Sequence, residues 1–279
     1  MALVLAASTD SADAQVWRTL STSRQVRGES QLDVEVEFTS GTLRLFPGVR
    51  ERLYRVEARY DEEIFESSTS YDPRDSHLEI KVTPRDHDGV DLDLDDDSPQ
   101  FLDLALTPAI PLSLDLKFGA ARSQIELGGL AVHRAVVKTG ASSGRIGFDS
   151  PNRITCEELE VAVGAAELTV YGLGHARCEQ VKLAGGAGDV TLDFTGSWPG
   201  GFLTEAEIIM GLGGLRLRIP ENVGVQLSMN RLFASFEKQG FEKRGSHWVS
   251  ENYDDATAIL ELRVRAFLGD IAVDWVPAR

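Results

Sequence analysis

Short alternations of apolar and polar residues run along most of this chain, and small residues interrupt them. In residues 163–170, Val163 and Val170 are typical of strands, whereas Gly164 and Ala165 between them favour strands poorly. An alternation of period 2 predicts strands with one buried face, and a glycine inside every such segment argues against helices. The pattern therefore predicts an all-β protein.

The interruptions recur at a nearly constant spacing. Each repeat has an alternating segment, a glycine, a few small residues and a second alternating segment, and it is clearest in residues 114–219. A period of about 22 residues with two short strands predicts a β-solenoid, in which each repeat is one coil and neighbouring coils stack about 4.8 Å apart. The second segments begin 21, 22, 22 and 25 residues apart, at Ile125, Ile146, Leu168, Val190 and Leu215.

Glycine marks the corners of the expected coils. At a corner the backbone needs unusual φ and ψ angles and a close approach to the coils above and below, which glycine and small side chains permit. We assign this structural role to Gly119, Gly140, Gly164, Gly186 and Gly211.

The repeat divides the chain into three parts. Residues 106–279 form the expected solenoid domain, with weaker copies of the repeat at 225–238 and 261–275. Residues 16–105 alternate without a fixed period and are interpreted as an antiparallel β cap, because the open end of a solenoid must be covered against edge-to-edge aggregation. Residues 1–15 are interpreted as the remnant of a signal peptide.

The N-terminal segment contains Ala12-Asp13-Ala14, which matches the small-residue pattern of a signal-peptide cleavage site. A signal peptide whose start codon lies upstream of Met1 would send the protein to the periplasm or the medium, with Gln15 as its first mature residue. The alternative is the frayed polar start of a cytoplasmic protein. We favour export.

The net charge of −16 over 279 residues limits the partners of the chain. Phosphate backbones and anionic lipid would repel so acidic a protein, which argues against nucleic acid and membrane surfaces. No apolar run approaches the about 18 residues of a membrane span. We expect a protein or a cell-wall partner.

No motif supports a catalytic or cofactor site. Residues 140–144 match G-x-S-x-G around Ser142, but a strand is expected after the serine, where a nucleophile elbow needs a helix. Residues 185–193 resemble a calcium-binding nonapeptide, but the aspartate falls one residue early and the motif occurs once. The histidines show none of the spacings of a catalytic zinc site. We expect no cofactor and no enzymatic activity.

The strongest run of charge lies in residues 87–100. Its alternation predicts a strand with an acidic face in solvent, followed by an acidic loop. Clustered carboxylate oxygens suit calcium, so Asp95, Asp96 and Asp97 are weak candidates for a calcium site.

Three aromatic residues lie on expected turn insertions. Trp198 falls in the enlarged turn that lengthens one repeat to 25 residues, and Trp248 and Tyr253 fall in the insertion 243–256. Aromatic rings on loops of a rigid scaffold are typical of binding surfaces, so all three are candidate binding residues. The alternative is that they cover the side or end of the solenoid.

The two cysteines, Cys156 and Cys178, are 22 residues apart, which equals the local repeat. They should therefore occupy the same position in adjacent coils, with Cα atoms about 4.8 Å apart. That distance allows a disulfide, but the Cβ vectors of stacked residues run nearly parallel, which leaves the Cβ atoms farther apart than a disulfide prefers. We expect two buried, stacked thiols, with a disulfide as the alternative.

Two short segments, GAGDVTLDF at 186–194 and FLGDIAVDW at 267–275, carry a family resemblance. The chain resembles the bacterial toast-rack, adhesin-like proteins, whose β-strand-repeat domain is shared with LiaF-like cell-envelope stress proteins. The resemblance is clearest over residues 106–279. It implies a β-helical, non-enzymatic domain, usually outside the cytoplasmic membrane.

From these features we expect an extracytoplasmic structural or interaction module, adhesin-like and linked to cell-envelope processes. The alternative is a carbohydrate-active β-helix enzyme, a polysaccharide lyase or hydrolase, because carboxylates are plentiful although no pair stands out.

Overall fold

The computed structural model describes residues 16–85, 99–236 and 239–278. These residues form strands with a single short helix, which confirms the all-β class. The elements are β1 (Trp17–Gln25), β2 (Leu32–Pro47), β3 (Arg52–Asp61), β4 (Phe65–Asp72), β5 (His77–Pro84), β6 (Phe101–Leu106), β7 (Leu112–Glu126), β8 (Val132–Gly147), β9 (Cys156–Tyr171), α1 (Leu173–Ala176), β10 (Cys178–Asp193), β11 (Leu203–Pro220), β12 (Val223–Phe236), β13 (Phe241–Arg244), β14 (His247–Ser250) and β15 (Ala258–Val276).

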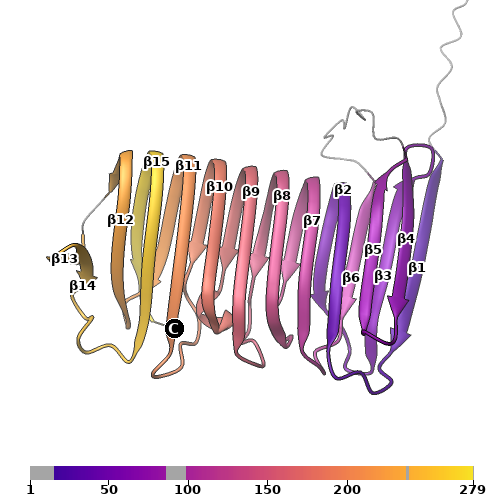
Figure 1. Cartoon of the computed structure of the whole chain (residues 1–279), viewed down its shortest axis with the longest axis horizontal. Helices are drawn as coiled ribbons and strands as arrows, with labels where there is room; N and C mark the ends of the chain where they lie inside the picture. Colours follow the sequence, from indigo (N-terminus) through magenta and orange to yellow (C-terminus); the bar gives the residue numbers. More distant parts are fainter. Residues whose placement is uncertain (1–15, 86–98, 237–238, 279) are drawn as a thin grey trace, which may run out of the picture.

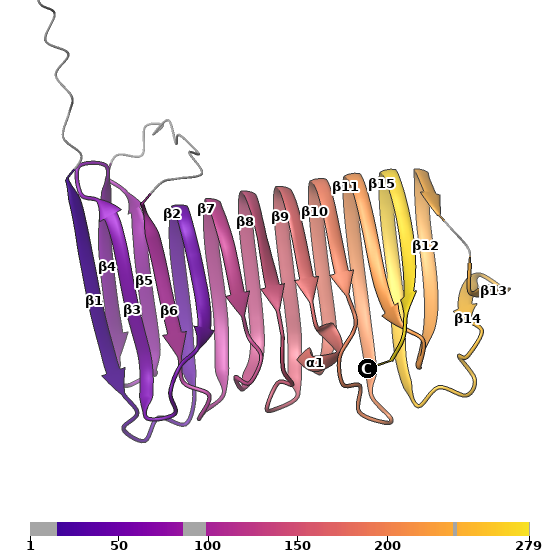
Figure 2. The same cartoon turned by 180° about the vertical axis from the view of Figure 1, so that it is seen from behind.

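Most of the molecule is a row of long parallel strands in the order β2, β7, β8, β9, β10, β11, β15 and β12. Figures 1 and 2 show each of these strands running along one face, bending at one edge and returning along the other face. Neighbours pair on both sides of the bend; β9 and β10, for example, pair from Cys156–Cys178 to Val170–Leu192. We call the edge where the strands fold back the bend edge.

Stacked apolar side chains fill the interior between the two faces. Leu183 in β10 lies opposite Val161 in β9 and Ile208 in β11, and all three are buried. Burial of one such side chain is worth about 1.5–3 kcal/mol. Because the alternation has period 2 and the register is kept from strand to strand, each row of the core continues along the stack.

The glycines assigned to the corners lie at the bend edge. A Cβ atom on Gly164 would lie 2.9 Å from the carbonyl oxygen of Gly140 in the previous strand, and one on Gly119 would lie 2.5 Å from that of Thr39. At these two positions glycine is required because the neighbouring backbone comes close, and not because the φ angle is unusual. The left-handed φ angles occur elsewhere in the bends, at Gly188 (119°) and Gly213 (122°) among others.

The strands at the two ends of the row pair in different ways. At the N-terminal end, β3 pairs antiparallel with β1 on one side and with β6 on the other, and β4 pairs antiparallel with β5. Strand β2 lies within the predicted cap segment 16–105, yet it pairs in parallel with β7 and belongs to the row. At the other end, β13 and β14 form a hairpin against β12.

The order of the strands departs from the order of the chain near the C-terminus. Strand β15 lies between β11 and β12 and pairs in parallel with both. The copy of the repeat at 225–238 is therefore farther from β11 than the copy at 261–275, which follows it in sequence.

Among the described residues, no helix has the length and apolar character needed to cross a membrane.

Candidate functional site

The structure places the predicted aromatic binding residues partly inside the protein. Trp198 is half-buried, packs against the core, and its indole N–H donates a hydrogen bond of 2.8 Å to the carbonyl oxygen of Phe194. Trp248, also half-buried, packs edge-on against Phe236 with the ring centres 6.2 Å apart. These contacts favour the interpretation that both tryptophans cover the core.

Tyr253 is half-buried in the turn between β14 and β15, where its backbone N–H donates to Ser250. The three aromatic residues thus lie on three different segments: the β10–β11 connection, β14 and this turn.

Neither the weak calcium candidates nor the rejected G-x-S-x-G motif gains support. Asp95, Asp96 and Asp97 lie outside the described residues. Over the segments that the structure describes, no group of three or more His, Cys, Asp and Glu side chains is arranged to hold a metal. Ser142 lies inside β8, in register with Ala121 of β7, and β8 continues to Gly147, so the helix that a nucleophile elbow needs does not follow.

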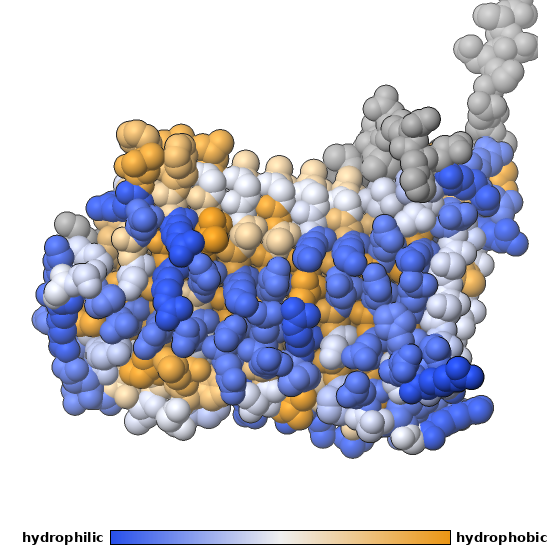
Figure 3. Space-filling model, in the orientation of Figure 1, coloured by the Kyte–Doolittle hydropathy of each residue, from blue (hydrophilic) through white to orange (hydrophobic). Residues whose placement is uncertain are grey.

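Large exposed apolar side chains gather on the bend edge of three neighbouring strands, a feature that the sequence analysis missed. Between 45% and 67% of each of these residues is exposed. Figure 3 shows them as an orange protrusion above β11, β15 and β12. The rings of Phe233 and Phe267 meet edge to face, 6.3 Å apart. We call this surface the apolar ridge: Leu212, Leu232, Phe233, Phe267 and Leu268.

The ridge continues a row that holds small residues in the neighbouring strands. Across β8, β9 and β10 the paired residues are Ala141, Ala165 and Ala187, which we call the alanine shelf. The same position continues through Leu212 and Leu268 to Phe233 in β11, β15 and β12. The bend edge therefore steps up from small to large side chains between β10 and β11.

A groove of about 670 Å³ runs beside the shelf. Four corner glycines line it, together with Phe38, Phe118 and Val163, and Lys117, Lys138 and Glu37 also border it. At three of these corners a Cβ atom would lie less than 3.0 Å from a carbonyl oxygen of the strand before it, whereas at Gly140 it would lie 3.5 Å away. We call the groove the glycine groove; its four corner glycines are Gly119, Gly140, Gly164 and Gly186.

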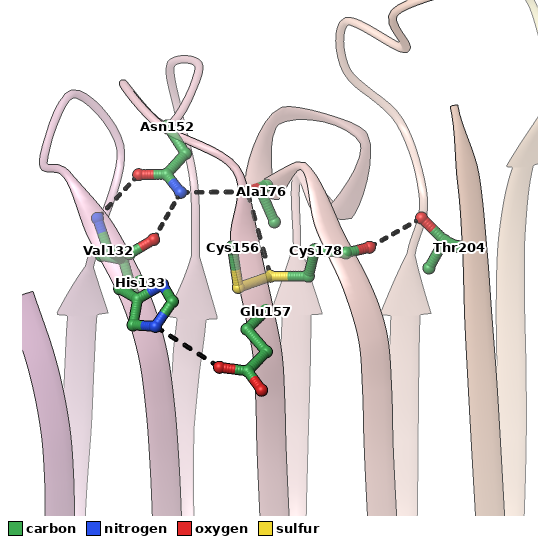
Figure 4. The surroundings of a disulfide bond; sticks show 8 residues. All are labelled: Val132, His133, Asn152, Cys156, Glu157, Ala176, Cys178 and Thr204. Carbon is green, nitrogen blue, oxygen red and sulfur yellow. Dashed lines mark hydrogen bonds and ion pairs between the residues drawn. A yellow bond between two sulfur atoms is a disulfide. The ribbon is translucent and has the colours of Figure 1, made fainter. Parts of the chain in front are cut away.

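The cysteines lie near the ends of β9 and β10 that are opposite the bend edge, and Figure 4 shows them joined by a disulfide. Their Cα atoms are 4.2 Å apart, which confirms the predicted adjacency. The expectation of two free thiols is wrong. The Cα atoms are closer than the usual strand spacing of about 4.8 Å, so the side chains can meet despite their parallel stacking.

Hydrogen bonds beside the disulfide link β9 and β10 to the neighbouring strands (Figure 4). The side chain of Asn152 is fully buried; its oxygen accepts from Val132 N at 2.8 Å, and its amide donates to the carbonyl oxygens of Val132 and Ala176 at 2.8 and 3.2 Å. Thr204 Oγ1 donates to the carbonyl oxygen of Cys178 at 2.9 Å. The disulfide and these hydrogen bonds thus link strands β8 to β11 at the end opposite the bend edge.

Ion pairs also join side chains of β8, β9 and β10. Glu158 in β9 is buried and accepts hydrogen bonds from Lys182 in β10 and, at 2.9 Å, from Arg134 in β8. These bonds, led by that from Lys182, hold the pKa of Glu158 below its ordinary value, against the opposing effect of burial.

A family model for the N-terminal domain of toast_rack, DUF2154, matches residues 8–170. The chain belongs to the toast-rack family. The match covers more than half of the chain, and it includes the N-terminal segment, whereas the sequence motifs that suggested the toast-rack resemblance lie mainly in the C-terminal half.

Solved structures resemble this toast-rack protein only distantly. A candidate cell adhesion protein from Clostridium sporogenes is 16% identical, with a TM-score of 0.48, and the alignment covers 93% of this chain and 100% of that one. A candidate adhesin from Bacteroides fragilis is 10% identical, with a TM-score of 0.30 and coverage of 92% and 97%. A candidate lipid binding protein from Parabacteroides distasonis is 8% identical, with a TM-score of 0.27 and coverage of 93% and 96%. No curated protein matches the chain.

Proposed function

We propose that this toast-rack protein is a non-enzymatic, adhesin-like interaction module: a β-solenoid outside the cytoplasmic membrane that presents a binding surface to a protein or cell-wall partner. The parallel register from β7 to β11, which shifts once at the start of β7 between Leu112 and Ser113, supports the solenoid part of the proposal.

The observation that carries the proposal is the apolar ridge. Monomeric proteins expose isolated apolar residues, but a contiguous apolar patch marks a surface that binds. Here two phenylalanines and three leucines project together from adjacent bends of a rigid stack. Rigid aromatic anchors lose little conformational entropy on binding, so they contribute strongly to affinity.

The disulfide supports the location. Disulfides persist in the periplasm and outside the cell and are rare in the reducing cytoplasm. The bond between Cys156 and Cys178 therefore favours an extracytoplasmic module, and it agrees with the signal-peptide interpretation of residues 1–15.

The rival proposal, a carbohydrate-active enzyme, finds little support in the glycine groove. Glycoside hydrolysis uses a pair of carboxylates at about 5–10 Å. Among the described residues that line the groove, Glu37 is the only carboxylate, and Lys117 and Lys138 border the same groove. A screen of acidic polysaccharides and glycans should therefore show no turnover by the purified protein.

The binding proposal is tested with fluorescently labelled protein on cells of the producing bacterium and on isolated cell walls. The double variant Phe233→Ser/Phe267→Ser removes the two ridge aromatics and should weaken binding at least tenfold. The matched control is Val49→Ser, which removes an exposed apolar side chain (57% exposed) from the β2–β3 connection, away from the ridge. Equal binding by wild type and the ridge variant would refute the proposal.

A further inference from the structure

The apolar ridge and the alanine shelf are complementary in height and lie next to each other. Ala187, the last residue of the shelf, pairs directly with Leu212, the first residue of the ridge. Ala141 and Ala165 are exposed, so the shelf is an open surface. One edge of the protein thus holds a raised apolar surface and a lower one side by side.

The register extends this complementarity to the glycine groove. Met210 pairs with Ala266 and Leu212 with Leu268, so Phe267 in β15 takes the position of Gly211 in β11. By the same reasoning Leu232 takes this position in β12. Each bend of the shelf strands β8 to β10 therefore carries Gly-Ala, whereas β15 carries Phe-Leu and β12 carries Leu-Phe.

We propose that the partner of the apolar ridge is a second copy of this chain, bound edge to edge about a two-fold axis. The axis crosses the bend edge between β10 and β11, perpendicular to the two faces of the stack. This rotation turns one copy upside down and reverses the order of its strands. The ridge of each copy then lies on the shelf of the other, as an isologous interface requires.

The pairing is specific because every large side chain meets a small one. Counting strands outward from the axis, β11, β15 and β12 of one copy lie over β10, β9 and β8 of the other. Leu268 lies over Ala165 of the second copy, and Phe233 lies over its Ala141. Phe267 and Leu232 lie over glycine positions and enter the glycine groove, which supplies the concave surface.

The size of the contact predicts a weak dimer. Six strands at about 4.8 Å give an edge about 24 Å long, and the two faces are about 10 Å apart. This area is below the about 800 Å² per partner of a standard interface, so we expect dissociation constants in the micromolar range.

Charge does not oppose this arrangement strongly. Glu167, Asp189 and Asp270 lie in one row of each copy. Asp189 faces Gly214 of the second copy, so the like charges that face each other directly are Asp270 and Glu167 of the second copy. Each lies two residues beyond the contact rows, so four residues at about 3.3 Å separate them by roughly 13 Å, which exceeds the Debye length of about 10 Å at 0.1 M salt. The dimer should therefore persist, or strengthen, as salt is raised.

The inference rests on the proposed function, since it names the partner of the proposed binding surface. Sedimentation velocity of the wild type, from about 1 μM to about 1 mM, should show a monomer–dimer equilibrium. Leu268→Ser in the ridge and Ala165→Glu in the shelf should each raise the dissociation constant at least tenfold, while Val49→Ser leaves it unchanged. Circular dichroism checks that each variant keeps its β-structure.

A cysteine pair tests the geometry independently of affinity. Leu268→Cys with Ala165→Cys should give a covalent dimer on oxidation, whereas Leu268→Cys with Val49→Cys should not. A wild type that stays monomeric at about 1 mM would overturn the inference, and so would a dimer that is unchanged in Ala165→Glu. Equal crosslinking by the two cysteine pairs would also overturn it. Binding of a monomer to anionic vesicles through the ridge would overturn it as well. A monomer that still needs the ridge for cell binding would overturn the inference alone; a dimer without cell or cell-wall binding would overturn the proposed function alone.

Discussion

A Cβ atom on Gly164 would lie 2.9 Å from the carbonyl oxygen of Gly140, the residue at the same bend of the neighbouring strand. Real Cβ atoms rarely approach a backbone oxygen so closely. At Gly140 the corresponding distance, to the carbonyl oxygen of Gly119, is 3.5 Å, which is an ordinary contact. The two glycines share one role in the sequence repeat but differ in the room around them.

We therefore predict that Gly164→Ala destabilises the protein by about 1–3 kcal/mol, because the strands must separate locally. Gly140→Ala is the matched control and should change the free energy of unfolding by less than about 1 kcal/mol in either direction. Ser142→Ala, in the same bend as Gly140, should also be nearly neutral. Urea unfolding measures all three, and equal costs at Gly164 and Gly140 would contradict the close-approach argument.

Reduction should weaken the stack. The disulfide between Cys156 and Cys178 spans 22 residues, and a loop of this length is worth about 3 kcal/mol through the unfolded state. We predict that a reductant lowers the Tm of the wild type and leaves the Tm of Cys156→Ala/Cys178→Ala unchanged. A wild-type Tm that does not respond to complete reduction, verified by thiol labelling, would show that the bond adds no stability.

The buried amide of Asn152 should contribute more than a surface asparagine. Asn152→Ala leaves the N–H of Val132 and two carbonyl oxygens without their partner, and each unsatisfied buried group costs about 1–3 kcal/mol. We predict a loss of at least about 2 kcal/mol. Asn222→Ala, at an exposed position, is the control and should stay within about 0.5 kcal/mol. Similar losses in the two variants would refute the role of Asn152.

Acid should remove the contribution of Glu158. Its pKa is lowered in the folded protein by the hydrogen bonds from Lys182 and Arg134, so the folded state favours the charged form. The resulting stability is present above the ordinary carboxyl pKa of 4.5 and is lost as the pH falls below it and through the folded pKa. The stability difference between wild type and Glu158→Gln should therefore shrink from pH 7 to pH 3. A stability difference that stays constant with pH would contradict this role of the Glu158 ion pairs.

Much of the fold could be predicted from the sequence because the period of the pattern equals the number of residues between partners in neighbouring strands. Leu168 and Val190, 22 residues apart in the repeat, are direct partners in β9 and β10. The same arithmetic placed Cys156 opposite Cys178, although the bond between them depends on a local approach of the backbones that a period does not reveal.

The order of the last strands could not be predicted in this way. Both β12 and β15 carry the alternating pattern, and periodicity does not distinguish a strand added at the end from one inserted between β11 and β12. The apolar ridge did leave a signal. The repeat at 225–238 lacks its glycine, and Leu232 and Phe233 stand where other bends carry small residues. Large apolar residues at a corner point outward, and this pattern is the sequence signal of the proposed binding surface.

Photocrosslinking at the ridge tests the central claim most directly. A photoreactive p-benzoylphenylalanine in place of Phe233, in the producing cell, should give a discrete crosslinked product, with a mass twice that of the chain where the second copy is the partner. The same group in place of Val49, which is exposed but lies outside the ridge, should give none. Absence of a product at position 233 above the level at position 49 would contradict the claim that the apolar ridge is a contact surface.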